Sequence, residues 1–188
     1  MTTAVFRNAS HALHVSYLIT SMPATTRSPT AIVIDQLVKA NHVWDGLPPP
    51  EHSQVNFSGL SPLEVRLQCA QVVSMVNHLQ HPAERHALEA IYGQQVVKAQ
   101  GVRGMAAYCG PAVGLSDTAM LYLGWHVYAR AHQRDGITQQ SIASEFGLTL
   151  AKVRSATDTI KRYGQNLHGR AIDALTGRFL AGGLIDAE

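Results

Sequence analysis

The feature that most constrains this chain is a pair of apolar helical patterns that meet at one glycine. Between residues 137 and 163, Ala143, Gly147 and Val153 follow one another at intervals of four and six residues. Two helices that cross through a short turn need a small residue at the crossing and a turn residue that tolerates positive φ. They also need an apolar residue that returns to the crossing from the second helix. The segment therefore predicts two helices joined by a tight turn.

Caps and apolar neighbours support the same prediction. Thr138 and Thr149 stand where the N-caps of the two helices are expected, and both are residues that cap well. Further apolar residues are placed to fill the space between the helices: Ile142, Phe146, Leu148 and Ile160. We therefore predict a helix-turn-helix over residues 138–163, with its second helix over 149–163.

The rest of the chain also favours helices. Apolar residues recur at helical spacing over residues 8–20, 30–42, 61–80, 83–92, 116–133 and 165–180. The start of the third segment, Ser61-Pro62-Leu63-Glu64, combines a cap, a proline in the first turn and a capping-box glutamate. No stretch alternates over the length of a strand. The predicted fold class is all-α, a helical bundle with a C-terminal helix-turn-helix.

Glycines mark the places where we expect the helices to stop. Gly101 and Gly104 flank what reads as a short segment ending near Cys109-Gly110-Pro111. Gly182-Gly183 and the acidic residues after it predict a frayed end.

Charge is concentrated on the segment that carries the motif. The whole chain has a formal net charge of only +2, yet residues 149–170 hold five basic residues and the single acidic residue Asp158. The five are Lys152, Arg154, Lys161, Arg162 and Arg170. A basic second helix in a helix-turn-helix is typical of proteins that dock in the major groove of DNA.

Each residue of this segment can be given an expected role. Arg154 is the candidate for a base contact, because its planar fork pairs with guanine O6 and N7. Lys152, Lys161, Arg162 and Arg170 are expected at phosphates, as are Gln139 and Gln140 of the first helix. The complete set of candidate DNA-binding residues is Gln139, Gln140, Thr149, Ala151, Lys152, Arg154, Ser155, Asp158, Lys161, Arg162 and Arg170.

Proline content predicts the division into domains. Residues 45–60 contain Pro48-Pro49-Pro50 between two glycines, which indicates a linker. We expect residues 1–60 to form an N-terminal helical segment with this linker, and residues 61–188 to form a helical DNA-binding domain.

Other chemistry has little support in the sequence. The two cysteines, Cys69 and Cys109, form no CxxC pair, and the ten histidines form no HExxH motif, so we expect no metal. The sequence has no nucleophile elbow and no phosphate-binding loop, and Gly101-Val-Arg-Gly104 lacks the strand context of one. We therefore expect neither an enzyme nor a cofactor. Since neither a secretory leader nor an apolar run of membrane length is evident, we expect a soluble cytoplasmic protein.

Two parts of the chain together resemble a known family. Pro82-Ala-Glu-Arg-His-Ala-Leu-Glu-Ala-Ile-Tyr-Gly93 and Ile137-Thr-Gln-Gln-Ser-Ile-Ala-Ser-Glu-Phe-Gly-Leu148 resemble the two halves of sigma factor region 4. About 44 residues separate them here, whereas sigma factors have only a few. The inserted segment and the overall size resemble phage regulators of the Q antiterminator type, which act on RNA polymerase near a promoter.

These observations lead to one expected function and two alternatives. The expected function is a sequence-specific transcription regulator of phage or prophage type that binds double-stranded DNA, with antitermination through RNA polymerase as the form implied by the resemblance. Residues 1–60 and the helix at 61–80 would then serve dimerisation or polymerase contact. The alternatives are a phage protein that uses the basic face to inhibit a host complex, and a terminase small subunit, which would form a ring.

Overall fold

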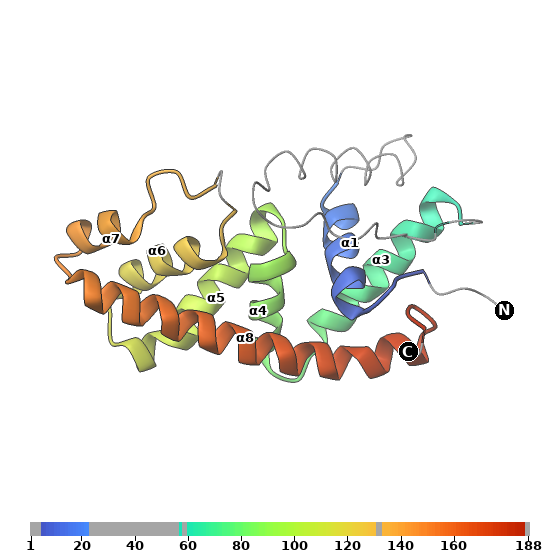
Figure 1. Cartoon of the computed structure of the whole chain (residues 1–188). Coiled ribbons are helices and arrows are strands. Elements are labelled where there is room, and N and C mark those ends of the chain that lie inside the picture. The colour runs from blue at the N-terminus through green and yellow to red at the C-terminus, as the bar shows by residue number, and fades with distance from the viewer. Residues whose placement is uncertain (1–4, 23–56, 58–59, 131–132, 187–188) are drawn as a thin grey trace. The chain divides into compact units, whose positions relative to one another are not determined.

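The computed structural model describes residues 5–22, 57, 60–130 and 133–186. These ranges hold seven helices and no strand, which confirms the all-α class. The helices are α1 (Ala9–Ser21), α3 (Pro62–Asn77), α4 (Pro82–Tyr92), α5 (Gln95–Val113), α6 (Asp117–Tyr128), α7 (Gln139–Glu145) and α8 (Leu150–Ala181) (Figure 1). The predicted helix over 30–42 and most of the predicted linker over 45–60 lie outside the described residues.

The chain forms two compact units. The first unit comprises Met1–His78 with Ile172–Glu188, and the second unit comprises Leu79–Ala171. The long helix α8 therefore contributes its first 22 residues to the second unit and its last ten to the first. The boundary predicted near residue 60 lies beside residues outside the described ranges and stays a prediction.

In the first unit, α1 packs on α3, and α3 begins as predicted. The Ser61 side chain accepts a hydrogen bond from the backbone N–H of Glu64, and the Glu64 carboxylate accepts one from the N–H of Ser61 at 2.7 Å. Pro62 occupies the first turn, where its missing N–H leaves no partner unsatisfied. This reciprocal capping fixes the start of α3.

The residues after α8 are packed, so the predicted frayed end is wrong as far as residue 186. The Phe6 backbone N–H donates to the Leu184 carbonyl at 3.0 Å, and Phe6 pairs with Ile185 as an isolated bridge. Leu184 and Ile185 are both buried. The two glycines reverse the chain, with Gly183 at φ 64°, and apolar burial then outweighs the freedom of a tail.

In the second unit, α4 crosses α5 at a distance that only glycine permits. A Cβ on Gly101 would overlap the backbone nitrogen of Ala90 and lie 2.6 Å from the carbonyl carbon of Glu89. A Cβ on Gly104 would overlap the ring of His86. The prediction of a short segment over 101–111 is therefore wrong, because α5 runs without interruption through both glycines. Tertiary packing outweighs the low helix propensity of glycine here.

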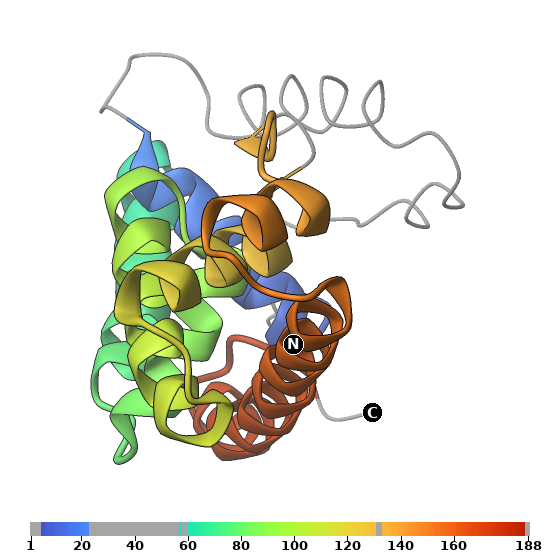
Figure 2. The same cartoon turned by 90° about the vertical axis from the view of Figure 1, so that its left-hand side faces the viewer.

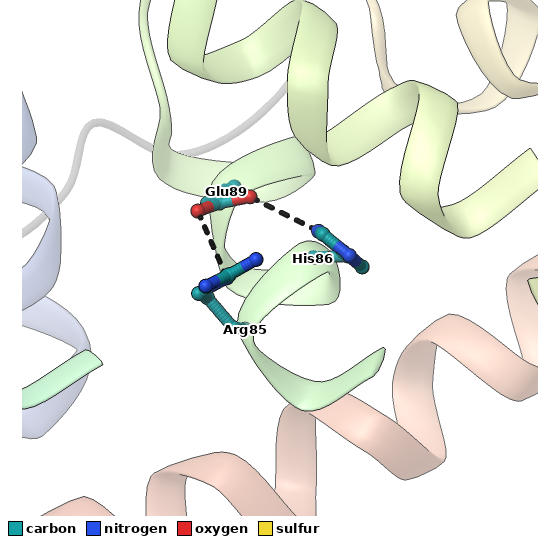
Figure 3. Close-up of polar contacts among 3 residues, drawn as sticks. All are labelled: Arg85, His86 and Glu89. Atoms are coloured by element: carbon teal, nitrogen blue, oxygen red, sulfur yellow. Dashed lines mark hydrogen bonds and ion pairs between the residues drawn. The ribbon is translucent and has the colours of Figure 1, made fainter. Parts of the chain in front are cut away.

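Polar side chains lie beside the same crossing. The Glu89 carboxylate is buried and contacts two residues of its own helix, Arg85 Nε at 3.4 Å and His86 Nδ1 at 3.2 Å (Figure 3). Both partners lie within one turn of Glu89, so they follow from helical spacing. This cluster gives the buried Glu89 carboxylate two partners on α4, of which Arg85 is itself partly exposed.

Two helix ends in this unit differ from prediction. The helix predicted over 116–133 begins at Asp117, with Ser116 as its N-cap, and ends at Tyr128. The two helices predicted over 149–163 and 165–180 are one helix, α8 (Figure 1). Gly164 lies inside it because a Cβ there would overlap the Tyr128 hydroxyl.

None of the described helices is both long and apolar enough to cross a bilayer.

One lysine is buried in the second unit. Lys98 is only 4% exposed, and its Nζ donates to the carbonyl oxygens of Ala90 at 2.7 Å and Ile91 at 3.5 Å. It thereby satisfies carbonyls at the C-terminal end of α4, where a positive charge is favourable. Burial, with a smaller effect from the positive charge of Arg130, lowers the pKa of Lys98 to about 8.

We expect Lys98→Met to remove a pH dependence of stability. The pKa of Lys98 in the folded protein lies below the ordinary value of 10.5, so the unfolded chain binds more protons than the folded protein between pH 8 and 10.5. The contribution of Lys98 to the free energy of unfolding therefore increases as pH rises through that window. The wild type should gain about 3 kcal/mol relative to the variant across it. Urea unfolding at several pH values measures this difference.

The exposed Lys152 supplies the matched control, since Lys152→Met makes the same substitution at a side chain outside the core. Comparison between variants is needed because burial raises the pKa of Cys69 and Cys109 to about 11, which lowers stability at alkaline pH in all of them. A difference in the free energy of unfolding between the wild type and Lys98→Met that stays constant from pH 7.5 to 10.5 would contradict the prediction.

Candidate nucleic-acid interface

The first helix of the candidate interface, α7, is fixed at its start by side chains. Thr138 caps α7 as predicted: its Oγ1 accepts from the Ser141 N–H at 3.0 Å, and the Thr138 N–H donates to Ser141 Oγ at 2.9 Å. Ser141 Oγ also donates to the Gly136 carbonyl at 2.7 Å. His126 of α6 contacts the Ile137 carbonyl through Nδ1 at 3.0 Å. The entry to α7 is thus held from both sides.

The turn between α7 and α8 has the geometry that its glycine predicts. Gly147 has φ 60°, in the left-handed region. The Leu148 N–H donates to the Ala143 carbonyl at 2.9 Å, and the Gly147 N–H donates to the Ser144 carbonyl at 3.5 Å. These two bonds form a Schellman motif that ends α7. Thr149 then caps α8, because its Oγ1 accepts from the Lys152 N–H at 3.3 Å.

The apolar residues predicted between the two helices share one core. Ile142 of α7 and Val153 of α8 are buried together with Ile160. The small residue of the pattern, Ala143, is half-buried against the same core, as are Phe146 and Leu148. Phe146 also meets the Tyr122 ring edge-on, at 5.4 Å between ring centres. The inner face of α8 is therefore fixed by packing.

The opposite face of α8 is exposed. We define the outer face as the exposed residues between the start of α8 and Arg162: Ala151, Lys152, Arg154, Ser155, Asp158, Lys161 and Arg162. All seven are predicted DNA-binding residues. Three of them, Ser155, Asp158 and Arg162, line a shallow hollow that is open to solvent, together with the half-buried Thr159. Of the remaining predicted residues, Thr149 and Gln140 are exposed and Gln139 is half-buried.

The cations of the outer face form no ion pair within the described part of the chain. Within the described part of the chain, Lys152, Arg154 and Lys161 have neither a hydrogen bond nor an ion pair through their side chains. The Arg162 guanidinium lies 5.9 Å from the centre of the Tyr163 ring. Residues 79–171 hold ten Lys and Arg against six Asp and Glu, whereas the remainder of the chain holds five against seven. The positive charge of the chain thus lies in the second unit.

Arg170 differs from the other predicted phosphate contacts. Its guanidinium lies 2.9 Å from the carboxylate of Glu84, which is buried. Breaking such a pair leaves a charge without a partner in the interior, so the fold holds this arginine in place. Its ion pair ties α4 to α8, and we expect Arg170 to contribute less to a phosphate interface than Lys161 or Arg162.

The structure adds residues that the sequence patterns did not single out. Gln165 and Asn166 are exposed on α8 one turn after Arg162. They were overlooked because the second helix was expected to end at residue 163, before Gly164. Helical spacing from Ser155, Asp158 and Arg162 is the signal that points to them.

No protein-family model matches this chain, and no curated protein matches it at a significant level. Among the described residues, no three His, Cys, Asp or Glu side chains gather closely enough to hold a metal ion.

Proposed function

We propose that this chain is a sequence-specific DNA-binding transcription regulator that uses α7 and α8 as a helix-turn-helix. The single observation that carries the proposal is the outer face of α8, where four cations lie beside short side chains and form neither a hydrogen bond nor an ion pair through their side chains with the described part of the chain. A recognition helix needs this combination, because short residues let it approach base edges while Lys and Arg neutralise phosphates.

The arrangement of charge within the outer face supports this use. Ala151 and Ser155 lie one turn apart, and their short side chains lie between the longer side chains of Lys152 and Arg154 around the helix. Ala151 can contact a thymine methyl group, and Ser155 can bond to a base or a phosphate. The resemblance of the motif to sigma factor region 4 and to Q-type regulators favours a phage or prophage regulator that acts with RNA polymerase, by antitermination.

The test is the salt dependence of binding to a duplex selected from a randomised pool. Three phosphate contacts, from Lys152, Lys161 and Arg162, should give a slope of about −3 in a plot of log affinity against log salt. Arg162→Ala should reduce the slope by about 1, whereas Arg170→Ala should leave it unchanged, because Arg170 is paired with Glu84.

Three outcomes would overturn the proposal. One is a pool from which the protein selects no sequence. A second is binding to an acidic protein but not to DNA, the behaviour of an inhibitor of a host complex. The third is a closed ring in light scattering, as a terminase small subunit requires.

A further inference from the structure

The outer face of α8 does not stop at Arg162. Gln165 and Asn166 follow it by three and four residues, so they lie on the same side of the helix, about 4.5 and 6 Å further along the axis. Both are exposed, and within the described residues neither side-chain amide has a hydrogen-bonding partner. The helix continues through Gly164 without interruption, and this glycine lies against Tyr128.

Amide side chains have a definite chemistry in the major groove. Asn and Gln pair with adenine through two hydrogen bonds, one to N6 and one to N7. A single continuous helix can make base contacts over several turns when it lies along the groove, as basic-region helices do. The two free amides that extend the outer face are uncharged, so they cannot neutralise phosphates. They are therefore better suited to recognising bases.

We propose that Gln165 and Asn166 extend base readout by one helical turn and recognise adenine beyond the bases that Arg154 and Ser155 face. This inference rests on the proposed function and adds the residues that set the far side of the recognition site. The readout ends there, because Gly169 offers no side chain and Arg170 is held by Glu84 at 2.9 Å.

The experiment compares DNA sites selected by the wild type with those selected by Gln165→Ala and Asn166→Ala. At least one of the two variants should bind the wild-type site about tenfold more weakly. It should lose its preference at one or two positions on one side of the site and keep the rest. Gln100→Ala, which changes an exposed glutamine of α5, is the matched control and should select the wild-type site. All three positions are exposed, so thermal unfolding should be unchanged.

The outcomes separate this inference from the proposed function. A wild type that selects no site overturns the proposed function itself. A wild type that selects a site, with both variants selecting the same site at equal affinity, overturns only the role of Gln165 and Asn166. A variant that binds all duplexes more weakly and keeps every base preference also overturns it, since it shows a backbone contact.

Discussion

Gly101→Ala should lower the free energy of unfolding by about 3 kcal/mol, at the upper end of the usual cost of overpacking. The added methyl group would overlap the Ala90 nitrogen and lie 2.6 Å from the carbonyl carbon of Glu89. These are backbone atoms of α4, so relief requires the two helices to move apart, which opens the core around Val102 and Ala87. Equilibrium unfolding in urea measures the loss.

Gly110 provides the matched control on the same helix. A Cβ at this position meets nothing within 4 Å, so Gly110→Ala should stabilise the protein by up to about 1 kcal/mol through helix propensity. The two substitutions make the same chemical change and should have opposite signs. Equal effects at both positions would show that α4 and α5 do not cross closely at Gly101.

Arg154→Ala should weaken binding to the selected DNA site about ten- to a hundredfold, the range expected for a bidentate contact between arginine and guanine. The side chain is exposed and makes no contact that the fold needs, so the variant should unfold like the wild type. The loss should fall on one base position, where the preference for guanine should relax. Fluorescence anisotropy with the selected duplex and with single-base substitutions measures both effects.

Arg103 is the matched control for this second prediction. It is an exposed arginine of α5 in the same unit, and its side chain has no ion pair among the described residues. Arg103→Ala should change affinity less than twofold. Similar losses from both variants would mean that binding follows total charge rather than the outer face of α8.

Local signals in the sequence predicted the parts of the fold that depend on neighbouring residues. The caps at Ser61, Thr138 and Thr149 and the turn at Gly147 all satisfy backbone groups within a few residues of themselves. Such patterns can be read from one segment, because both hydrogen-bonding partners lie inside it. The exposure of the predicted DNA-binding residues of α8 follows in the same way from helical spacing.

Contacts between distant segments explain what the sequence could not predict. Gly101 and Gly164 look like helix breakers in their own segments, and each is needed only because another helix lies against it. Gly93 illustrates the difference, since it ends α4 but has φ −58° rather than a left-handed value. Glycine is needed at this position because a Cβ would overlap the carbonyl oxygen of Glu89 and lie 3.0 Å from the backbone nitrogen of Lys98. The pairing of Arg170 with Glu84 was hidden for the same reason, because 86 residues separate them in sequence.

The continuity of α8 also has a consequence for how the protein can be dissected. Many domains can be released by cutting the exposed linker between them, because proteases act on loop tips and termini. The boundary between the two units after Ala171 falls inside a helix, at a point where no loop is available to a protease. A fragment that contains the outer face and stops there would lack the ten remaining helical residues, including the buried Leu175 and Phe179 that belong to the first unit. The outer face of α8 therefore cannot be separated as an independent domain, and its proposed function should be tested in the whole chain.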